Sequence, residues 1–186
     1  MKKIKLSPLS LLSYPALFLL CGAHIFALIL GACAIHEAGH LVIIKIKKLH
    51  IETLTITPTG LDIRRFGACS YWTEAAVSFA GPLFGGIAAG FAGAFGYSEF
   101  AAVNLCCTLL NLLPIPPLDG GCALRALLFC RIEYTVAEKA SRYIALCTLF
   151  IIYVLSILLL IYTEWNATLL LLCAVIFSGY FSTGKA

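Results

Sequence analysis

Charged residues are scarce in this sequence. Lys, Arg, Asp and Glu make up 12% of the 186 residues, whereas about 25% of an ordinary soluble domain is charged. Hydrophobic residues account for 61%, and the mean hydropathy is +0.99. So few charges could not cover the apolar surface of a soluble fold of this size. The composition excludes a cytosolic enzyme, a secreted disulfide scaffold and a disordered chain, and it predicts a membrane protein.

The spacing of a disulfide framework is also missing. The nine cysteines include no Cys-x-x-Cys pair. Most of them lie in or beside apolar runs, namely Cys21, Cys33, Cys106, Cys107, Cys130, Cys147 and Cys173. We therefore expect the cysteines to serve as small apolar residues rather than as cross-links.

Apolar runs extend along most of the chain. No Lys, Arg or Asp occurs between Leu6 and Ile44, and one helix of that length would approach twice the roughly 30 Å thickness of the hydrocarbon layer. This run predicts an uncleaved anchor and a second span, with a break near Gly22-Ala23-His24. The predicted spans are 9–21, 25–44, 75–95, 100–113, 144–162 and 167–180. We expect residues 1–186 to form a single membrane-embedded domain.

Basic residues are missing from alternate connections between these spans. The connections near His24, near Glu99 and around Glu164 carry none, so the positive-inside rule predicts a multi-pass protein of the cell membrane with both termini cytoplasmic. The net charge of +4 reflects the basic residues of the cytoplasmic connections. We therefore expect no nucleic-acid partner. The basic residues on the predicted cytoplasmic side are Lys2, Lys3, Lys5, Lys45, Lys47, Lys48, Arg64, Arg65, Arg125, Arg131, Lys139, Arg142 and Lys185.

The stretch from Leu49 to Thr73 is more polar and has a strand-like pattern. Apolar residues alternate with threonine up to Thr57, and Pro58-Thr59-Gly60 is a turn signal. We predict a short β-hairpin-like segment on the cytoplasmic side. The expected fold class is an all-α polytopic membrane protein with about six transmembrane helices and this short segment.

A metal-binding pattern lies near the cytoplasmic end of the second predicted span. His36-Glu37-Ala38-Gly39-His40 is a His-Glu-x-x-His motif. On a helix, histidines four residues apart share one face and can bind one zinc ion, while the glutamate can act as a base toward water. The alternative is a set of polar residues that bond between helices without a metal. Three ionisable residues at membrane depth are costly unless they are paired or functional, which favours the metal site.

A catalytic zinc site needs a third protein ligand and an open position for water. The candidate acids are Glu52, Asp62 and Glu74 in the polar stretch, Glu99 and Glu164 on the far side, Glu133 and Glu138 in a charged connection, and Asp119. Asp119 differs because it lies in an irregular segment, Asn111–Gly121, with three prolines and two glycines. Irregular backbone at membrane depth has to be buried in protein or line a cavity, whereas the alternative is an ordinary surface turn. Asn111 could hold this loop or position a substrate carbonyl.

The two motifs together resemble the site-2 protease family of intramembrane zinc metalloproteases (peptidase family M50). The resemblance rests on HEAGH, NLLPIPPLDGG and the intervening Ala80-Gly81-Pro82-Leu83, and it covers nearly the whole chain. It implies that His36, His40 and Asp119 bind one Zn²⁺ and that Glu37 activates water. It also implies that Asn111 helps to hold or polarise the substrate.

The resemblance further implies the partners. The expected substrate is a transmembrane protein in the lipid bilayer, such as a membrane-tethered transcription factor or anti-sigma factor, and a regulatory membrane partner is expected. The compact layout resembles the sporulation proteases of the family, but their C-terminal nucleotide-sensing CBS domain is not expected here. We hypothesise that the hairpin-like segment, Ile51–Ile63, offers an edge to which an unwound substrate pairs; the alternative for it is a surface cap.

Two other functions compete with the protease. A metal transporter would need acids or histidines on several spans, and the runs Ile144–Tyr162 and Ala167–Tyr180 contain none. A catalytically inactive membrane scaffold would retain the fold, but a purely structural zinc site has no use for the glutamate at position 37. The sequence therefore favours the enzyme.

Overall fold

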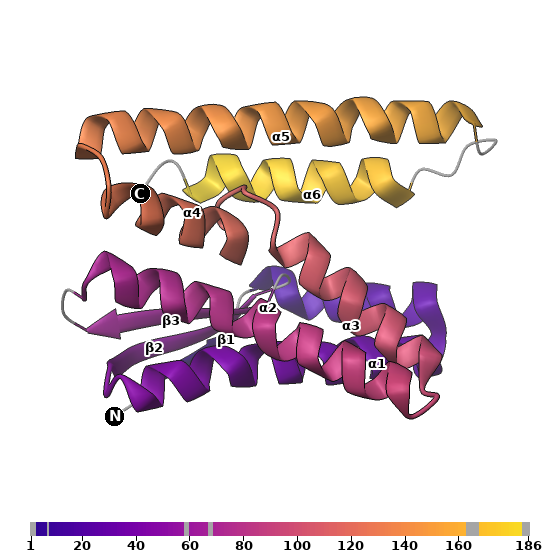
Figure 1. Ribbon diagram of the computed structural model, residues 1–186. Helices are drawn as coiled ribbons and strands as arrows, with labels where there is room; N and C mark the ends of the chain where they lie inside the picture. Colours follow the sequence, from indigo (N-terminus) through magenta and orange to yellow (C-terminus); the bar gives the residue numbers. More distant parts are fainter. Residues whose placement is uncertain (1–2, 7, 58–59, 67–68, 163–167, 184–186) are drawn as a thin grey trace. The chain divides into compact units, whose positions relative to one another are not determined.

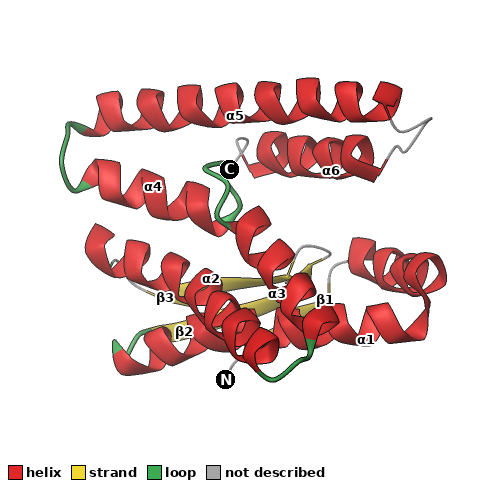
Figure 2. Ribbon diagram, turned by 45° about the vertical axis from the view of Figure 1, so that its right-hand side comes forward, coloured by secondary structure: helices red, strands yellow, loops and turns green. Residues whose placement is uncertain are grey.

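The computed structural model describes residues 3–6, 8–57, 60–66, 69–162 and 168–183. These residues are mostly helical (Figures 1 and 2). They form two compact parts, residues 1–110 and residues 111–186, which are described separately below.

Helix α1, Pro8–Ile46, is broken at the position that the sequence predicts. Gly22 has φ 74° and ψ 165°, a backbone conformation that a side chain would disfavour. The chain changes direction at this break (Figure 1). The rings of Phe18 and Phe26 meet edge to face across it, with their centroids 5.4 Å apart. The second half of α1 is therefore a separate straight segment that can carry the histidine motif.

The first part also contains a three-stranded sheet, with one strand before α1 in the sequence and two strands after it. Strand β1, Lys3–Leu6, pairs in parallel with β2, His50–Thr57, which pairs antiparallel with β3, Gly60–Phe66. The predicted, mostly helical class agrees with the structure, but the sequence analysis did not predict the parallel strand at residues 3–6, whose Lys-Ile-Lys-Leu alternation is a strand signal. Because β2 is paired on both sides, it cannot offer an edge to a substrate. Of the described strands with a side left open, β3 is the one within the predicted hairpin segment.

Two helices complete the first part. Helix α2, Tyr71–Ala94, begins after Ser70, whose hydroxyl accepts a hydrogen bond from the backbone N–H of Thr73 (3.3 Å). Helix α3, Ser98–Asn111, ends before Pro114, two residues short of the predicted end at 113. The backbones of α1 and α2 approach closely at Gly39, where a Cβ would lie 2.9 Å from the carbonyl carbon of Ala80.

The second part contains helices α4, Asp119–Phe129, α5, Tyr134–Tyr162, and α6, Thr168–Thr183. Helices α5 and α6 run side by side (Figures 1 and 2). Helix α4 was not predicted separately, and α5 begins ten residues before the predicted start at 144. The buried core of this part consists of Ile115, Ala145, Leu149 and Ile176. Ile115 comes from the proline-rich segment, so this segment is anchored between α5 and α6.

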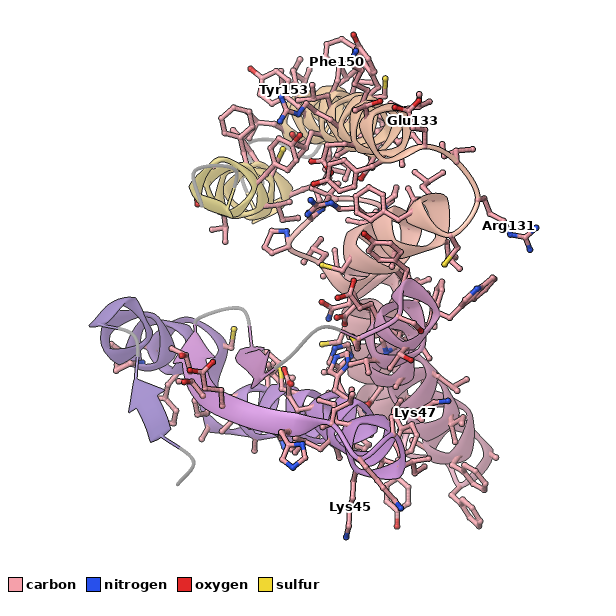
Figure 3. All side chains as sticks on the ribbon, turned by 90° about the vertical axis from the view of Figure 1, so that its left-hand side faces the viewer. Lys45, Lys47, Arg131, Glu133, Phe150 and Tyr153 are labelled. Carbon is pink, nitrogen blue, oxygen red and sulfur yellow. The ribbon has the colours of Figure 1, made fainter. Side chains whose placement is uncertain are left out.

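Three helices among the described residues are long and apolar enough to span a membrane: Cys21–Ile46, Tyr71–Ala94 and Tyr134–Tyr162. Helices α3 and α6 have 14 and 16 residues, fewer than the roughly 20 that cross a bilayer. The six-span arrangement therefore stays a prediction. In the last turn of the first long helix, Lys45 extends away from the ribbon (Figure 3).

Candidate metal centre

His36 and His40 lie one turn apart on α1, and their side chains converge. Both residues are buried, each with 7% of its surface exposed. Their Nε2 atoms are 3.1 Å apart, and the two rings meet at 77°. Two ring nitrogens of buried side chains, directed at one small volume, form the kind of donor pair that a transition metal binds.

The backbone of α2 fixes the orientation of one imidazole. Nδ1 of His40 lies 2.8 Å from the carbonyl oxygen of Val77. A carbonyl oxygen only accepts, so Nδ1 carries the proton and donates it, which leaves the Nε2 lone pair free of a proton. This is the tautomer in which Nε2 can bind a metal, and backbone carbonyls commonly set it in this way.

Gly81 of α2 provides the space that the imidazoles occupy. A Cβ at this position would lie 2.7 Å from Nε2 of His36 and still closer to Nε2 of His40. No side chain could fit there without displacing the ring nitrogens. The two imidazoles and this glycine therefore form a cradle whose donors and free volume suit a zinc ion.

Glu37 follows His36 directly on α1 and is half-buried, with Oε2 inaccessible to solvent. Around the helix its position is about 100° from His36 and about 60° from His40, so it lies to one side of the histidine pair. A carboxylate beside the histidine pair can take a proton from a water molecule without acting as a ligand.

The second part of the chain places Asp119 at the start of α4, where its side chain is half-buried. A helix N-terminus favours the ionised carboxylate, which is the form that binds metals. The preceding segment turns sharply, with the Leu118 N–H donating to the Ile115 carbonyl (2.9 Å). Asn111, the last residue of α3, is half-buried.

Two glycines hold the Asp119 loop tightly. A Cβ at Gly120 would lie 2.7 Å from the carbonyl oxygen of Leu113, and a Cβ at Gly121 would lie 2.6 Å from Cδ of Pro116. The chain folds back on itself so closely that only glycine fits at both positions. The main chain around Asp119 therefore has little freedom.

Sequence reasoning missed two buried polar residues in the first part. Asn104 and Thr108 are one turn apart on α3, with 1% and 6% of their surfaces exposed. Asn104 donates from Nδ2 to the Phe100 carbonyl (2.8 Å), whereas its Oδ1 and the Thr108 hydroxyl are buried and have no hydrogen-bond partner among the described residues. Thr108 packs against Gly85 of α2. The four-residue spacing of Asn104 and Thr108, which places them on one face of a helix, could have indicated this buried polar pair.

A surface pair joins α1, just after its break at Gly22, to the first turn of α3. Nε2 of His24 lies 2.7 Å from a carboxylate oxygen of Glu99, and both side chains are largely exposed. The sequence analysis placed these two residues in different connections on the same side.

The sequence is similar to known metalloproteases. The signature of peptidase family M50 matches residues 97–155. Proteins named "Putative zinc metalloprotease Rip3" from two strains of Mycobacterium tuberculosis, Erdman and H37Rv, are each 33% identical over 156 residues. The match covers 72% of this chain and 39% of each relative, so the chain spans about two fifths of their length.

The fold is similar to that of a solved structure, the site-2 protease from Methanocaldococcus jannaschii. The TM-score is 0.73, and the match covers 97% of this chain and 90% of that one. The sequences are 22% identical. This comparison shows a shared fold.

Proposed function

The chain belongs to peptidase family M50, the site-2 protease family, and we propose that it is an active intramembrane zinc metalloprotease. The proposed reaction is hydrolysis of a peptide bond in or near the transmembrane segment of a membrane-bound substrate. The observation that carries this proposal is the buried pair of Nε2 atoms of His36 and His40, 3.1 Å apart, in a His-Glu-x-x-His motif.

The proposed ligands of the single zinc ion are His36, His40 and Asp119. Two imidazoles and one carboxylate are a donor set of catalytic zinc sites, which keep a further position open. The tautomer of His40 and the space at Gly81 support the histidine part. The helix N-terminus and the rigid glycine loop support Asp119 as the carboxylate.

The remaining residues perform the proton transfers and hold the substrate. When bound, zinc acts as a Lewis acid that polarises a carbonyl and lowers the pKa of water toward about 7. Glu37 takes a proton from the attacking water and delivers it to the nitrogen of the leaving amine. The Asn111 amide donates to the substrate carbonyl oxygen as negative charge develops there.

A substrate helix has to unwind before its carbonyls can be attacked, because they are hydrogen-bonded within the helix. The open edge of β3 can pair with the unwound strand through main-chain hydrogen bonds. The hypothesis that a substrate pairs with the hairpin-like segment is therefore narrowed to strand β3, Gly60–Phe66.

The proposed topology has six spans with both termini in the cytoplasm. The proposed substrates are membrane-tethered transcription factors or anti-sigma factors, controlled by a regulatory membrane partner. Reporter fusions at residues 24, 99 and 165 test the topology, because all three should face away from the cytoplasm. A cytoplasmic reporter at any of them would contradict it.

Zinc content and cleavage together test the proposed function. The full chain is purified in detergent and incubated with a model transmembrane peptide that carries Gly-Pro near its cytoplasmic end. The wild type should bind about one zinc ion and cleave the peptide. Glu37→Gln should keep the zinc and lose cleavage, whereas Asp119→Ala should lose both. A folded wild type without zinc would contradict the proposal.

A further inference from the structure

Helix α5 is longer than its uncharged part. It is one of the three helices that are long and apolar enough to span a membrane, and it has 29 residues. At about 1.5 Å per residue it is about 43 Å long, whereas the hydrocarbon layer is roughly 30 Å thick. The stretch from Tyr143 to Tyr162 contains no charged side chain, and its length alone suffices to cross that layer. The turns before Tyr143 therefore lie at the level of the lipid headgroups.

Two basic side chains of these turns share one exposed face of α5. Lys139 and Arg142 are both exposed. Residues three apart on a helix are neighbours on its surface, with Cβ atoms about 5–6 Å apart. One anion can therefore contact both charges of this basic pair at the same time.

The acidic residues closest to the basic pair in the sequence have other partners. Glu138 accepts a hydrogen bond from Nε of Arg125 on α4 at 2.9 Å. Glu133 accepts a hydrogen bond from a hydroxyl two residues away at 2.8 Å. Among the described residues, the side chains of Lys139 and Arg142 form no ion pair. Their two positive charges are therefore available to an anion from outside the chain.

An exposed apolar surface continues from the basic pair along the same face of α5. Its members follow one another at spacings of three and four residues, which keeps them on one side of the helix. This apolar stripe consists of Tyr143, Leu146, Phe150 and Tyr153, all exposed. A basic pair at headgroup level that is continuous with an apolar stripe at hydrocarbon level has the charge and polarity pattern of an anionic phospholipid.

We propose that the basic pair and the apolar stripe bind one anionic phospholipid. The Arg142 guanidinium can donate two parallel hydrogen bonds to two phosphate oxygens, and the Lys139 ammonium supplies a second positive charge. The acyl chains lie along the apolar stripe, which a free phosphate ion cannot contact. A phosphatidylcholine headgroup fits less well, because its own cation already neutralises the phosphate. This site does not depend on the proposed protease function.

Lipid retention tests the site without any substrate. The full chain is purified in a neutral detergent and titrated with phosphatidylglycerol or phosphatidylcholine, and native mass spectrometry counts the lipids that stay bound. The wild type should retain one phosphatidylglycerol at a lower lipid concentration than phosphatidylcholine. Lys139→Gln/Arg142→Gln should weaken phosphatidylglycerol binding about 20-fold, because each basic residue at an anionic surface contributes about fivefold. Glycerol phosphate, which has no acyl chains, should not be retained.

Lys45→Gln/Lys47→Gln is the matched control, because it removes the same charge near the end of another candidate span. Lys45 and Lys47 are exposed, but residues two apart on a helix do not face each other, so they cannot share one phosphate. This variant should bind phosphatidylglycerol as the wild type does. Both variants should unfold at the wild-type temperature, because the changed side chains are exposed.

Four results would overturn the inference. The wild type could retain both lipids equally, or Lys139→Gln/Arg142→Gln could retain phosphatidylglycerol as the wild type does. An equal loss in the two double variants would show attraction to the total charge rather than binding at α5. Retention of glycerol phosphate as strong as that of phosphatidylglycerol would show a site for a free phosphate rather than for a lipid.

Discussion

Gly81 of α2 lies directly against the ring nitrogens of His36, and its missing side chain leaves the volume into which both imidazoles of the motif point. The backbone of the same helix also sets the tautomer of His40 through the Val77 carbonyl. A neighbouring helix therefore determines the position of the two histidine Nε2 atoms, although the motif itself lies on α1.

Gly81→Ala should weaken zinc binding about 10- to 100-fold, the range found when groups that orient metal ligands are changed. The added methyl group would displace Nε2 of both histidines. The measurement is zinc per purified chain across a chelator titration. Gly90→Ala on the same helix is the control, because no atom lies within 4 Å of a Cβ there. Equal zinc affinity in both variants would contradict the inference that the space at Gly81 is needed for zinc binding.

Gly120→Ala should destabilise the Asp119 loop. The new Cβ would meet the backbone of Leu112 and Leu113, which cannot move as a flexible side chain can. Overpacking of this kind costs about 1–3 kcal/mol, so thermal unfolding in detergent should shift downward. Gly179→Ala is a fair comparison because its Cβ would make an ordinary 3.7 Å contact with Pro117. A Gly120→Ala variant as stable as Gly179→Ala would show that the loop can move.

Thr108→Val should leave stability unchanged or raise it by about 1 kcal/mol. Its buried hydroxyl has no hydrogen-bond partner in the described residues, so valine removes a desolvated polar group without changing the shape. Thr148→Val provides the contrast, because that hydroxyl donates to the Ile144 carbonyl at 2.8 Å. The unfolding temperature of Thr108→Val should therefore be higher than that of Thr148→Val. A clear loss of stability in Thr108→Val would show that its hydroxyl is bonded.

Proline at Asp62 and proline at Ile63 should have different effects. Neighbouring N–H groups of an edge strand point in opposite directions, one toward β2 and one toward the open side. Proline at the inward position should disrupt the sheet. Proline at the outward position should preserve folding and zinc content but lower cleavage about tenfold, since one or two main-chain hydrogen bonds to the substrate strand are lost. Full cleavage by both folded variants would contradict strand pairing at this edge.

The local features were predictable from the sequence because short-range chemistry determines them. The four-residue spacing of His36 and His40 placed them on one helical face, and Gly22 marked the break in α1. Asp119 was expected in an irregular proline segment, and the structure has it at the end of such a segment. In each case one helix turn or one loop carries the signal.

The features that sequence reasoning missed depend on composition or on contacts between distant residues. Hydropathy detected only the apolar part of α5, because its first turns contain Glu138, Lys139 and Arg142 and are helical without being apolar. The parallel pairing of β1 with β2 and the contact of His24 with Glu99 join residues that are far apart in the sequence. No periodicity within a single element indicates such pairs.

The glycine contact on α2 also limits the direction from which a peptide can arrive. Main chain occupies the side of the imidazoles that faces α2, and the approach at Gly39 and Ala80 leaves no gap between the two helices one turn away. If the chain is the proposed protease, a scissile bond would not enter between α1 and α2. It would come from another side of α1, so the residues that line those other sides would govern which bond of a substrate is cut.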